Sequence, residues 1–243
     1  MSTFLVLTNK LLRRFNEVEL TQSTFGNAKG VHGLAKDAIV ASLNDINQQN
    51  WKWPFNYVGA NTGSIYVTGV IGQEIYDYPL TAEDIDLDNI YIQPISGGIS
   101  ATQLVRIDHD QYKRHYRKEA LDADTVAEYS PPTMVTRTPD AKMIVHPKPD
   151  LAYVFIVPHW VIPTEPVAYS DTVRIPSRFD DVIAEGAMWH LHSMRGNLQE
   201  ASLTKKEAFL ARVKHMRTLL INQNNSMTDT RILRRSGYSL RYL

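Results

Sequence analysis

The chain has 243 residues, of which 43% are hydrophobic and 21% charged, so it can bury a sizeable core and is not wholly disordered. Lys and Arg together number 26, as do Asp and Glu, and this zero net charge argues against a surface devoted to nucleic acid. The absence of cysteine excludes disulfides, thiolate metal sites and cysteine nucleophiles. The longest apolar runs, 4–7 and 151–157, fall far short of the roughly 20 residues of a membrane span, and no basic-then-apolar leader opens the chain. We therefore expect a soluble protein made in the cytoplasm, with no membrane partner.

Two amphipathic helices are predicted at the start of the chain. Large apolar residues recur at three- and four-residue spacing over 4–15, where Ser2 or Thr3 can serve as N-cap. The same spacing returns over 31–46, and Pro54 prevents the second helix from continuing. The tryptophans at this exit are expected to pack the helix onto its neighbour.

The middle of the chain has the pattern of a small β domain. Short β-rich runs alternate with Gly, Pro, Asn and Asp, and they cover 64–68, 89–92, 103–107, 134–136 and 142–145. The run 151–157 is apolar at both alternations, as in a central strand buried on both faces. One helix is expected within this region, over 109–121. Irregularly spaced short strands indicate an antiparallel sandwich or barrel.

Helical spacing returns after Pro176 and again after a capping box at 204–207. In the first of these helices, Gly186 and Ala187 would allow a close helix–helix approach. The predicted fold class is therefore α+β, with a four-helix bundle built from both chain ends (1–56 and 176–225). The β-rich domain would occupy 57–175, and an extended C-terminal arm would follow over 226–243.

Candidate chemical groups are few, because the sequence lacks the phosphate-loop, dinucleotide-binding, zinc-protease and nucleophile-elbow motifs. His190 and His192 are two residues apart, so a helix points them to different faces. We interpret them as a core histidine and a surface histidine. Glu83, Asp84, Asp86 and Asp88 could bind a hard cation or hydrolyse a glycoside. A solvated turn is the favoured interpretation. No catalytic residue, metal ligand or cofactor is assigned.

A basic and aromatic stripe is predicted on the helix at 109–121. It contains Tyr112, Arg114, Tyr116 and Arg117, next to further lysines. The stripe could bind nucleic acid, but a solvated face anchored by its tyrosines, or a contact with acidic residues on a neighbouring subunit, is favoured.

The last thirteen residues combine cations with large apolar side chains and contain no acid. Arg and Tyr are enriched where one protein anchors on another, so these residues predict a docking arm rather than an inert tail. The arm candidates are Arg231, Leu233, Arg234, Arg235, Tyr238, Arg241 and Tyr242.

Several stretches together resemble head-to-tail adaptor (connector) proteins of short-tailed, podovirus-type bacteriophages, above all those of marine phages. They are 9–20, 35–48, 51–56, 145–153, 175–188 and 216–222. The resemblance implies a virion protein at the head–tail junction, made in the host bacterial cytoplasm. It would form a homo-oligomeric ring, usually of twelve subunits, between the portal protein and the tail nozzle. Double-stranded genomic DNA would pass through the ring without sequence recognition.

The same resemblance implies which parts meet which partner. The helical part would form the subunit-to-subunit and portal-facing layer, the β part would meet the nozzle, and the arm would reach the portal. The resemblance implies that this protein has a role in virion assembly, and it implies no active-site residue. The alternatives are another ring component such as a tail-tube or stopper protein, a small hydrolase, and a single-stranded nucleic-acid-binding protein.

Overall fold

The structure is a computed structural model that describes residues 1–49, 52–59, 65–95, 101–116, 129–197, 199 and 206–221. The chain divides into two compact units, one formed by Met1–Phe55 with Pro163–Leu243 and the other by Asn56–Ile162. The first unit is helical and the second is β-rich, so the predicted α+β fold class is confirmed.

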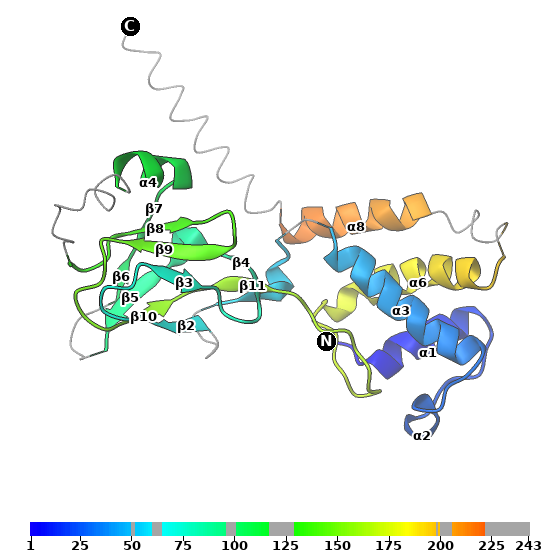
Figure 1. The fold of residues 1–243 in the computed structure, drawn as a ribbon. Coiled ribbons are helices and arrows are strands. Elements are labelled where there is room, and N and C mark those ends of the chain that lie inside the picture. The colour runs from blue at the N-terminus through cyan, green and yellow to red at the C-terminus, as the bar shows by residue number, and fades with distance from the viewer. Residues whose placement is uncertain are drawn as a thin grey trace, which may run out of the picture. The chain divides into compact units, whose positions relative to one another are not determined.

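The helical unit combines helices from both ends of the sequence (Figure 1). Its helices are α1 (Phe4–Arg14), α2 (Gln22–Phe25), α3 (Val31–Asn47), α6 (Asp180–Met194) and α8 (Lys206–Leu220), with a short 3₁₀ turn at Ser177–Phe179. Both predicted N-terminal helices are present at their predicted positions, and Thr3 is the N-cap of α1. The short α2 was not predicted; it is held by a capping box between Thr21 and Thr24.

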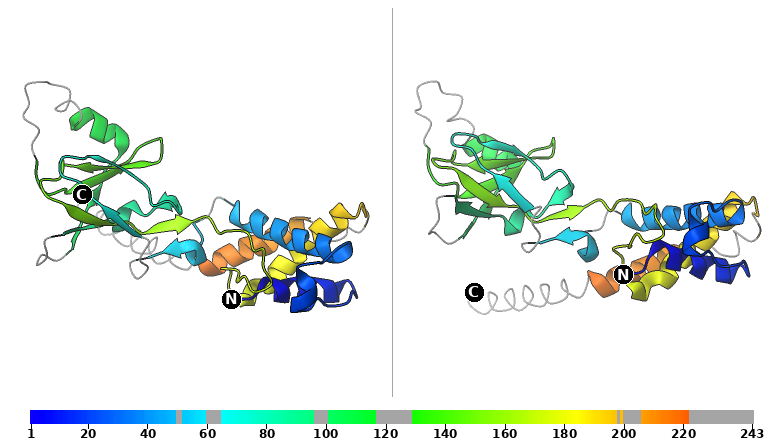
Figure 2. Two further views of the ribbon diagram at one scale, coloured as in Figure 1. Left: turned by 60° about the horizontal axis from the view of Figure 1, so that its bottom comes forward. Right: turned by 90° about the horizontal axis from the view of Figure 1, so that it is seen from below.

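Helix α6 is the central element of this unit, because it packs against α1, α3 and α8 (Figures 1 and 2). The predicted close approach at Gly186 is confirmed. A Cβ atom at this position would lie 2.4 Å from the Ser42 hydroxyl of α3 and 2.6 Å from the Phe209 ring of α8. Only glycine therefore lets three helices meet at this level. The four predicted helices α1, α3, α6 and α8 are present together with the short α2, and α8 joins the others chiefly through α6.

A charged junction connects the N-terminal helix to the start of α6. Lys10 and Arg14 on α1 reach one oxygen of Asp181, at 3.1 and 2.6 Å. These contacts, the Lys10 hydrogen bond first, lower the pKa of Asp181 below its usual value. The hydroxyl of Ser2 donates to the neighbouring Asp180 at 2.6 Å. Both carboxylates lie in the first turn of α6, where negative charge is favourable to the helix dipole.

Residues 163–175 belong to the helical unit, whereas the predicted boundary placed them in the β-rich domain. The backbone of Phe4 donates to Asp171, and that of Val173 donates to Ser2. The side chains of Val173 and Ile175 are buried in the same core as the helices. The predicted boundary followed Pro176 as the start of helical spacing, and the sequence before it shows no feature that assigns it to the helices.

The described strands of the β-rich unit pair into three sheets, and the strands are drawn as arrows in Figures 1 and 2. Its strands are β1 (Tyr57–Val58), β2 (Tyr66–Thr68), β3 (Ile75–Asp77), β4 (Ala82–Ile85), β5 (Tyr91–Pro94), β6 (Thr102–Gln103), β7 (Val105–Arg106), β8 (Met134–Arg137), β9 (Lys142–His146), β10 (Tyr153–Ile156) and β11 (His159–Val161). The sheet orders are β1-β11-β4, β2-β10-β5-β6 and β3-β9-β8-β7. The predicted run 151–157 supplies β10, a central strand whose Tyr153 and Phe155 are buried while Val154 and Ile156 are partly exposed.

One core is shared by both four-stranded sheets, as in a sandwich. It contains Tyr76 of β3, Val135 of β8, Ile92 of β5 and Phe155 of β10. Within the described ranges no sheet closes into a barrel. Among the named strands the pairing is antiparallel except between β7 and β8, which run parallel, and an isolated parallel bridge joins Tyr129 to Lys148. The connection between β7 and β8 contains α4 (His109–His115), and parallel neighbours need such a long crossover.

Candidate functional site

The predicted aromatic and basic stripe lies on α4, whose first turn is capped by Asp108. Tyr112 is only 4% exposed, and its hydroxyl donates a hydrogen bond to the carboxylate of Glu74. This side chain therefore anchors α4 to its own unit instead of being displayed to a partner. The interpretation of the tyrosines as anchors is supported at this residue.

The rest of the stripe is divided between packing and solvent. The ring of Tyr116 lies 4.7 Å from that of His146 at the end of β9, and Arg114 is exposed. Tyr112 and Tyr116 face one another on the helix, with ring centroids 6.4 Å apart. Arg117 lies outside the described residues. Arg114 is thus the residue of this group whose side chain the structure leaves open to a partner.

The acidic cluster is divided between β4, which contains Glu83 and Asp84, and the 3₁₀ turn that follows, so the predicted solvated turn fits only the part after β4. Asp84 lies on β4 and forms an ion pair with Arg137 at 2.8 Å. Asp88 lies on a 3₁₀ helix, Leu87–Asn89, and pairs with Arg106 at 3.3 Å. The two arginines come from β8 and β7, so the acids connect neighbouring elements instead of converging on one point.

Asp86 in the same cluster takes part in a hydrogen-bonded network. It accepts from the hydroxyl of Tyr57 at 3.1 Å and from the amide of Asn89 at 2.8 Å. Burial, and next the bond to Asp86, raise the pKa of Tyr57 to about 12, so this phenol stays neutral at physiological pH. In the described part of the chain, no three His, Asp or Glu side chains are grouped so that they could hold a metal ion.

Of the two histidines of α6, His192 is not on the surface as predicted, whereas His190, with 16% of its side chain exposed, is close to its predicted core position. His190 is partly exposed and lies 3.0 Å from the carboxylate of Asp45 on α3. His192 is only 9% exposed and packs against the ring of Phe15, 4.8 Å away. The burial of His192 was not predicted because it depends on Phe15, which follows α1 and covers this side of α6. The pattern of apolar residues within α6 alone does not extend to that side.

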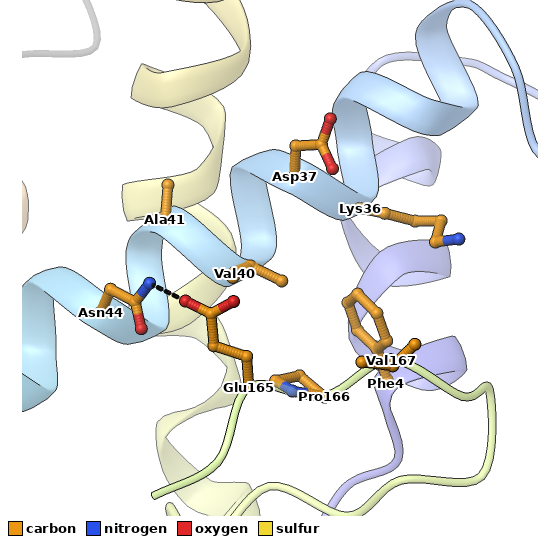
Figure 3. A pocket seen from close by; sticks show the side chains of 9 residues that line it. All are labelled: Phe4, Lys36, Asp37, Val40, Ala41, Asn44, Glu165, Pro166 and Val167. Carbon is orange, nitrogen blue, oxygen red and sulfur yellow. Dashed lines mark hydrogen bonds between the residues drawn. The ribbon is translucent and has the colours of Figure 1, made fainter. Parts of the chain in front are cut away.

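A shallow groove of about 400 Å³ lies on the helical unit between α3 and the segment 163–171 (Figure 3). Glu165 accepts a hydrogen bond from Asn44 at its edge, at 2.6 Å. The ammonium of Lys36 is engaged elsewhere, over the ring of Phe25 at 4.5 Å. Apolar side chains form much of the lining, among them Phe4, Val40, Pro166 and Val167. The polar groups do not converge on one point, so the groove resembles a contact surface more than a catalytic cleft.

An apolar patch on the β-rich unit was missed from the sequence. Val70 and Ile71 lie in the turn between β2 and β3 and are 53% and 58% exposed, and Tyr129 and Leu151 are comparably exposed. The backbone of Gly72 donates to Pro149, and the Tyr129 ring lies against Gly72, which brings the two segments together. The exposed side chains of Val70, Ile71 and Tyr129 gather at this turn, and an exposed apolar group of this kind is typical of a docking surface. No sequence signal marks them, because the residues come from separate segments.

The predicted docking arm, with Arg231, Leu233, Arg234, Arg235, Tyr238, Arg241 and Tyr242, lies outside the described residues. Its contact with a partner remains a prediction from composition.

Comparison with known proteins identifies the family. A family model described as the SU10 adaptor protein matches residues 2–235, which include both units and the first part of the arm. No curated protein gives a significant match. In the ranges that the structure describes, no helix is long and apolar enough to cross a membrane. The chain therefore belongs to the SU10 adaptor protein family and is a structural head–tail adaptor of the phage virion.

Proposed function

We propose that copies of this protein form a ring, of twelve subunits, that joins the portal protein to the tail nozzle of a short-tailed phage. The phage genome passes through the ring during ejection without sequence recognition. The observation that carries the proposal is the family match over residues 2–235, which covers both units in one alignment. The resemblance of the sequence to adaptors of marine podovirus-type phages supports the proposed number of subunits and the portal and nozzle as partners.

The mechanism in this proposal is geometric. A ring closes when the same pair of surfaces meets at every subunit boundary. The helical unit supplies the portal-facing layer. The β-rich unit faces the nozzle, and its exposed turn with Val70 and Ile71 offers an apolar contact surface.

The C-terminal arm makes the attachment to the portal in this account. Its arginines, Arg231, Arg234, Arg235 and Arg241, pair with portal carboxylates, and Tyr238 and Tyr242 fill pockets. Arginine suits this task because its planar guanidinium binds a carboxylate through two hydrogen bonds.

The hydrolase alternative finds little support in the described geometry. Two of the acids that it would use, Asp84 and Asp88, are paired with Arg137 and Arg106, and His190 is paired with Asp45. The nucleic-acid alternative predicts binding of single-stranded DNA that weakens steeply with salt. Another ring component, such as a tail-tube or stopper protein, would still form rings but would not bind isolated portals.

A truncation tests the portal attachment. A variant ending at Asn225 should keep the thermal unfolding profile of the full chain and lose attachment to purified portal rings, as measured by co-sedimentation. A matched variant keeps the length of the arm but replaces Arg231, Arg234 and Arg235 by alanine, and it should attach much more weakly. Undiminished attachment of the truncated protein would exclude the arm as the portal contact.

A further inference from the structure

The groove between α3 and the segment 163–171 has one wall that is fixed by hydrogen bonds. The carboxylate of Asp171 accepts from the backbone N–H groups of Val167 and Ala168, both at 2.8 Å. The backbone N–H of Phe4 donates to the carbonyl of Asp171, also at 2.8 Å. This wall is therefore tied to itself and to the start of α1. A preformed surface of this kind loses little conformational freedom when it binds a partner.

The lining of the groove is apolar and partly open to solvent. Val40 and Ala41 of α3 are half-buried, and so is Pro166 on the opposite wall. Val167 is 77% exposed, the most of any apolar side chain in the lining. A groove of about 400 Å³ with an open valine on its wall favours an occupant with large apolar side chains.

The charge left free at the groove is negative. Asp37 and Glu165 are both exposed, and Glu165 accepts its hydrogen bond from the neutral amide of Asn44. Lys36 also belongs to the lining, but its side chain runs away from Glu165 in Figure 3. Its ammonium donates to the backbone carbonyl of Phe25 at 3.3 Å and lies over the ring of the same residue. A suitable occupant therefore carries cations and apolar groups, and no acid.

The C-terminal arm has this composition. From Arg231 to Leu243 the sequence contains four arginines, six large apolar or aromatic residues and no Asp or Glu. Ile232 and Leu233 stand between Arg231 and Arg234, so basic and apolar side chains are adjacent. The guanidinium of arginine binds a carboxylate through two hydrogen bonds. The arm thus matches both the apolar lining of the groove and its carboxylates.

The arm is also attached to the unit that contains the groove. Helix α8 packs on α6, and α6 packs on α3, which forms one wall of the groove. Nine residues, 222–230, separate Ile221 from Arg231. An extended chain of that length spans about 30 Å, which is the width of a small domain. Because a short tether gives an effective concentration of about a millimolar, the arm of the same chain is favoured over a free partner.

We propose that the C-terminal arm docks in the groove of its own helical unit before assembly. Apolar side chains of the arm cover Val40 and Val167, and its arginines pair with Asp37 and Glu165. Portal carboxylates then compete with the groove for the same arginines, so the arm is released when the portal is present. The docking stands without the proposed function, whereas the release rests on it.

A distance measurement between two spin labels tests the docking on the full chain. The protein has no cysteine, so labels are placed by Thr164→Cys beside the groove and Ser236→Cys in the arm. Double electron–electron resonance should show one narrow distance component, because a docked arm holds its label in place. A single broad distribution would overturn the proposal. Loss of the narrow component in a large excess of unlabelled protein would also overturn it, because the arm would then be bound to another copy.

A cation on the groove wall should free the arm. Val167→Lys repels the arginines of the arm, so the narrow component should fall about tenfold, since like charges at a contact are strongly unfavourable. Val18→Lys is the matched control, because Val18 is 78% exposed in the same unit and lies outside the lining. Both variants should unfold at the temperature of the parent protein, because both change exposed side chains. Equal narrow components in the two variants would contradict docking in the groove.

Purified portal rings separate the docking from the proposed function. Their addition to the labelled protein should abolish the narrow component, and Val167→Lys should attach more tightly than the parent because none of its arm is docked in the groove. A narrow component that persists in portal-bound protein would overturn the release. If the protein shows the narrow component and never attaches to portals, the docking stands and the adaptor function falls. If it attaches although its arm gave only the broad distribution beforehand, the adaptor function stands and the docking falls.

Discussion

The hydroxyl of Ser42 on α3 donates a 2.9 Å hydrogen bond to the backbone carbonyl of Ile183 on α6, across 141 positions of sequence. The bond lies beside Gly186, where α3, α6 and α8 meet most closely. The helical unit is therefore closed by a contact between its N-terminal and C-terminal parts. Assembly of this unit depends on segments that the β-rich unit separates in sequence.

Replacing Gly186 by alanine should destabilise the helical unit. The added methyl would overlap the Ser42 hydroxyl and the Phe209 ring, and overpacking of this kind costs about 1–3 kcal/mol. Alanine's better helix propensity offsets only part of that cost. Thermal or urea unfolding measures the change. Gly33→Ala is the matched control, since Gly33 lies in α3 with ordinary contact distances, and there alanine should stabilise by about 0.5–1 kcal/mol. Equal stability of the two variants would contradict the three-helix contact.

Replacing Tyr112 by phenylalanine should loosen α4 from the β-rich unit. The change removes the hydroxyl that donates to Glu74 while keeping the ring, and the loss of such a bond costs about 1–2 kcal/mol. Hydrogen exchange of the α4 amides measures the effect locally. Tyr116→Phe is the control variant. Tyr116 packs through its ring against His146, so removal of its hydroxyl should change the exchange rates of the α4 amides little. Faster exchange in Tyr116→Phe than in Tyr112→Phe would show that Tyr116, and not Tyr112, holds α4 to the β-rich unit.

The stability of the helical unit should fall in acid partly through Asp181. Its pKa lies below the usual value of 3.8, so the stabilising contribution is present above about pH 4 and is lost as the pH falls through the lowered pKa. The side chain is 57% exposed, so we expect less than about 1 kcal/mol. Asp181→Asn should therefore unfold with a weaker pH dependence below pH 4. The difference should shrink in high salt; a difference that salt leaves unchanged would argue against an ion pair.

The exposed turn of the β-rich unit should tolerate a charge without loss of stability. Ile71 is 58% exposed, so Ile71→Asp should leave the unfolding free energy within about 0.5 kcal/mol of the parent value. Binding to purified nozzle protein should weaken, because a charge in an apolar contact must be desolvated. Surface plasmon resonance measures this binding. Undiminished binding would place the nozzle contact elsewhere on the unit.

The sequence predicted the elements whose pattern is local. Helices α1, α3 and α6 follow from apolar residues at helical spacing, and β8, β9 and β10 from runs rich in β-branched residues. The close helix–helix contact at Gly186 was predicted because glycine beside alanine leaves room on a helix surface for a neighbouring helix. These features depend on neighbours within one or two turns, which the sequence itself displays.

What the sequence could not predict depends on contacts between distant segments. His192 is buried because Phe15, far away in sequence, covers it. Asp84 is paired because β8 brings Arg137 alongside β4. The strands β3 and β11 have three residues each, too few to show a period, and their pairing to β9 and to β1 and β4 defines them. A pattern along one segment carries no information about which other segment will cover it.

Native mass spectrometry of the purified protein, alone and mixed with isolated portal rings, tests the central claim most directly. The account predicts that each portal ring binds twelve copies of the protein in one cooperative step. The complex should stay intact after the excess unbound protein is removed. Portal rings that retain no copies, or a random and continuously varying number, would contradict the adaptor ring.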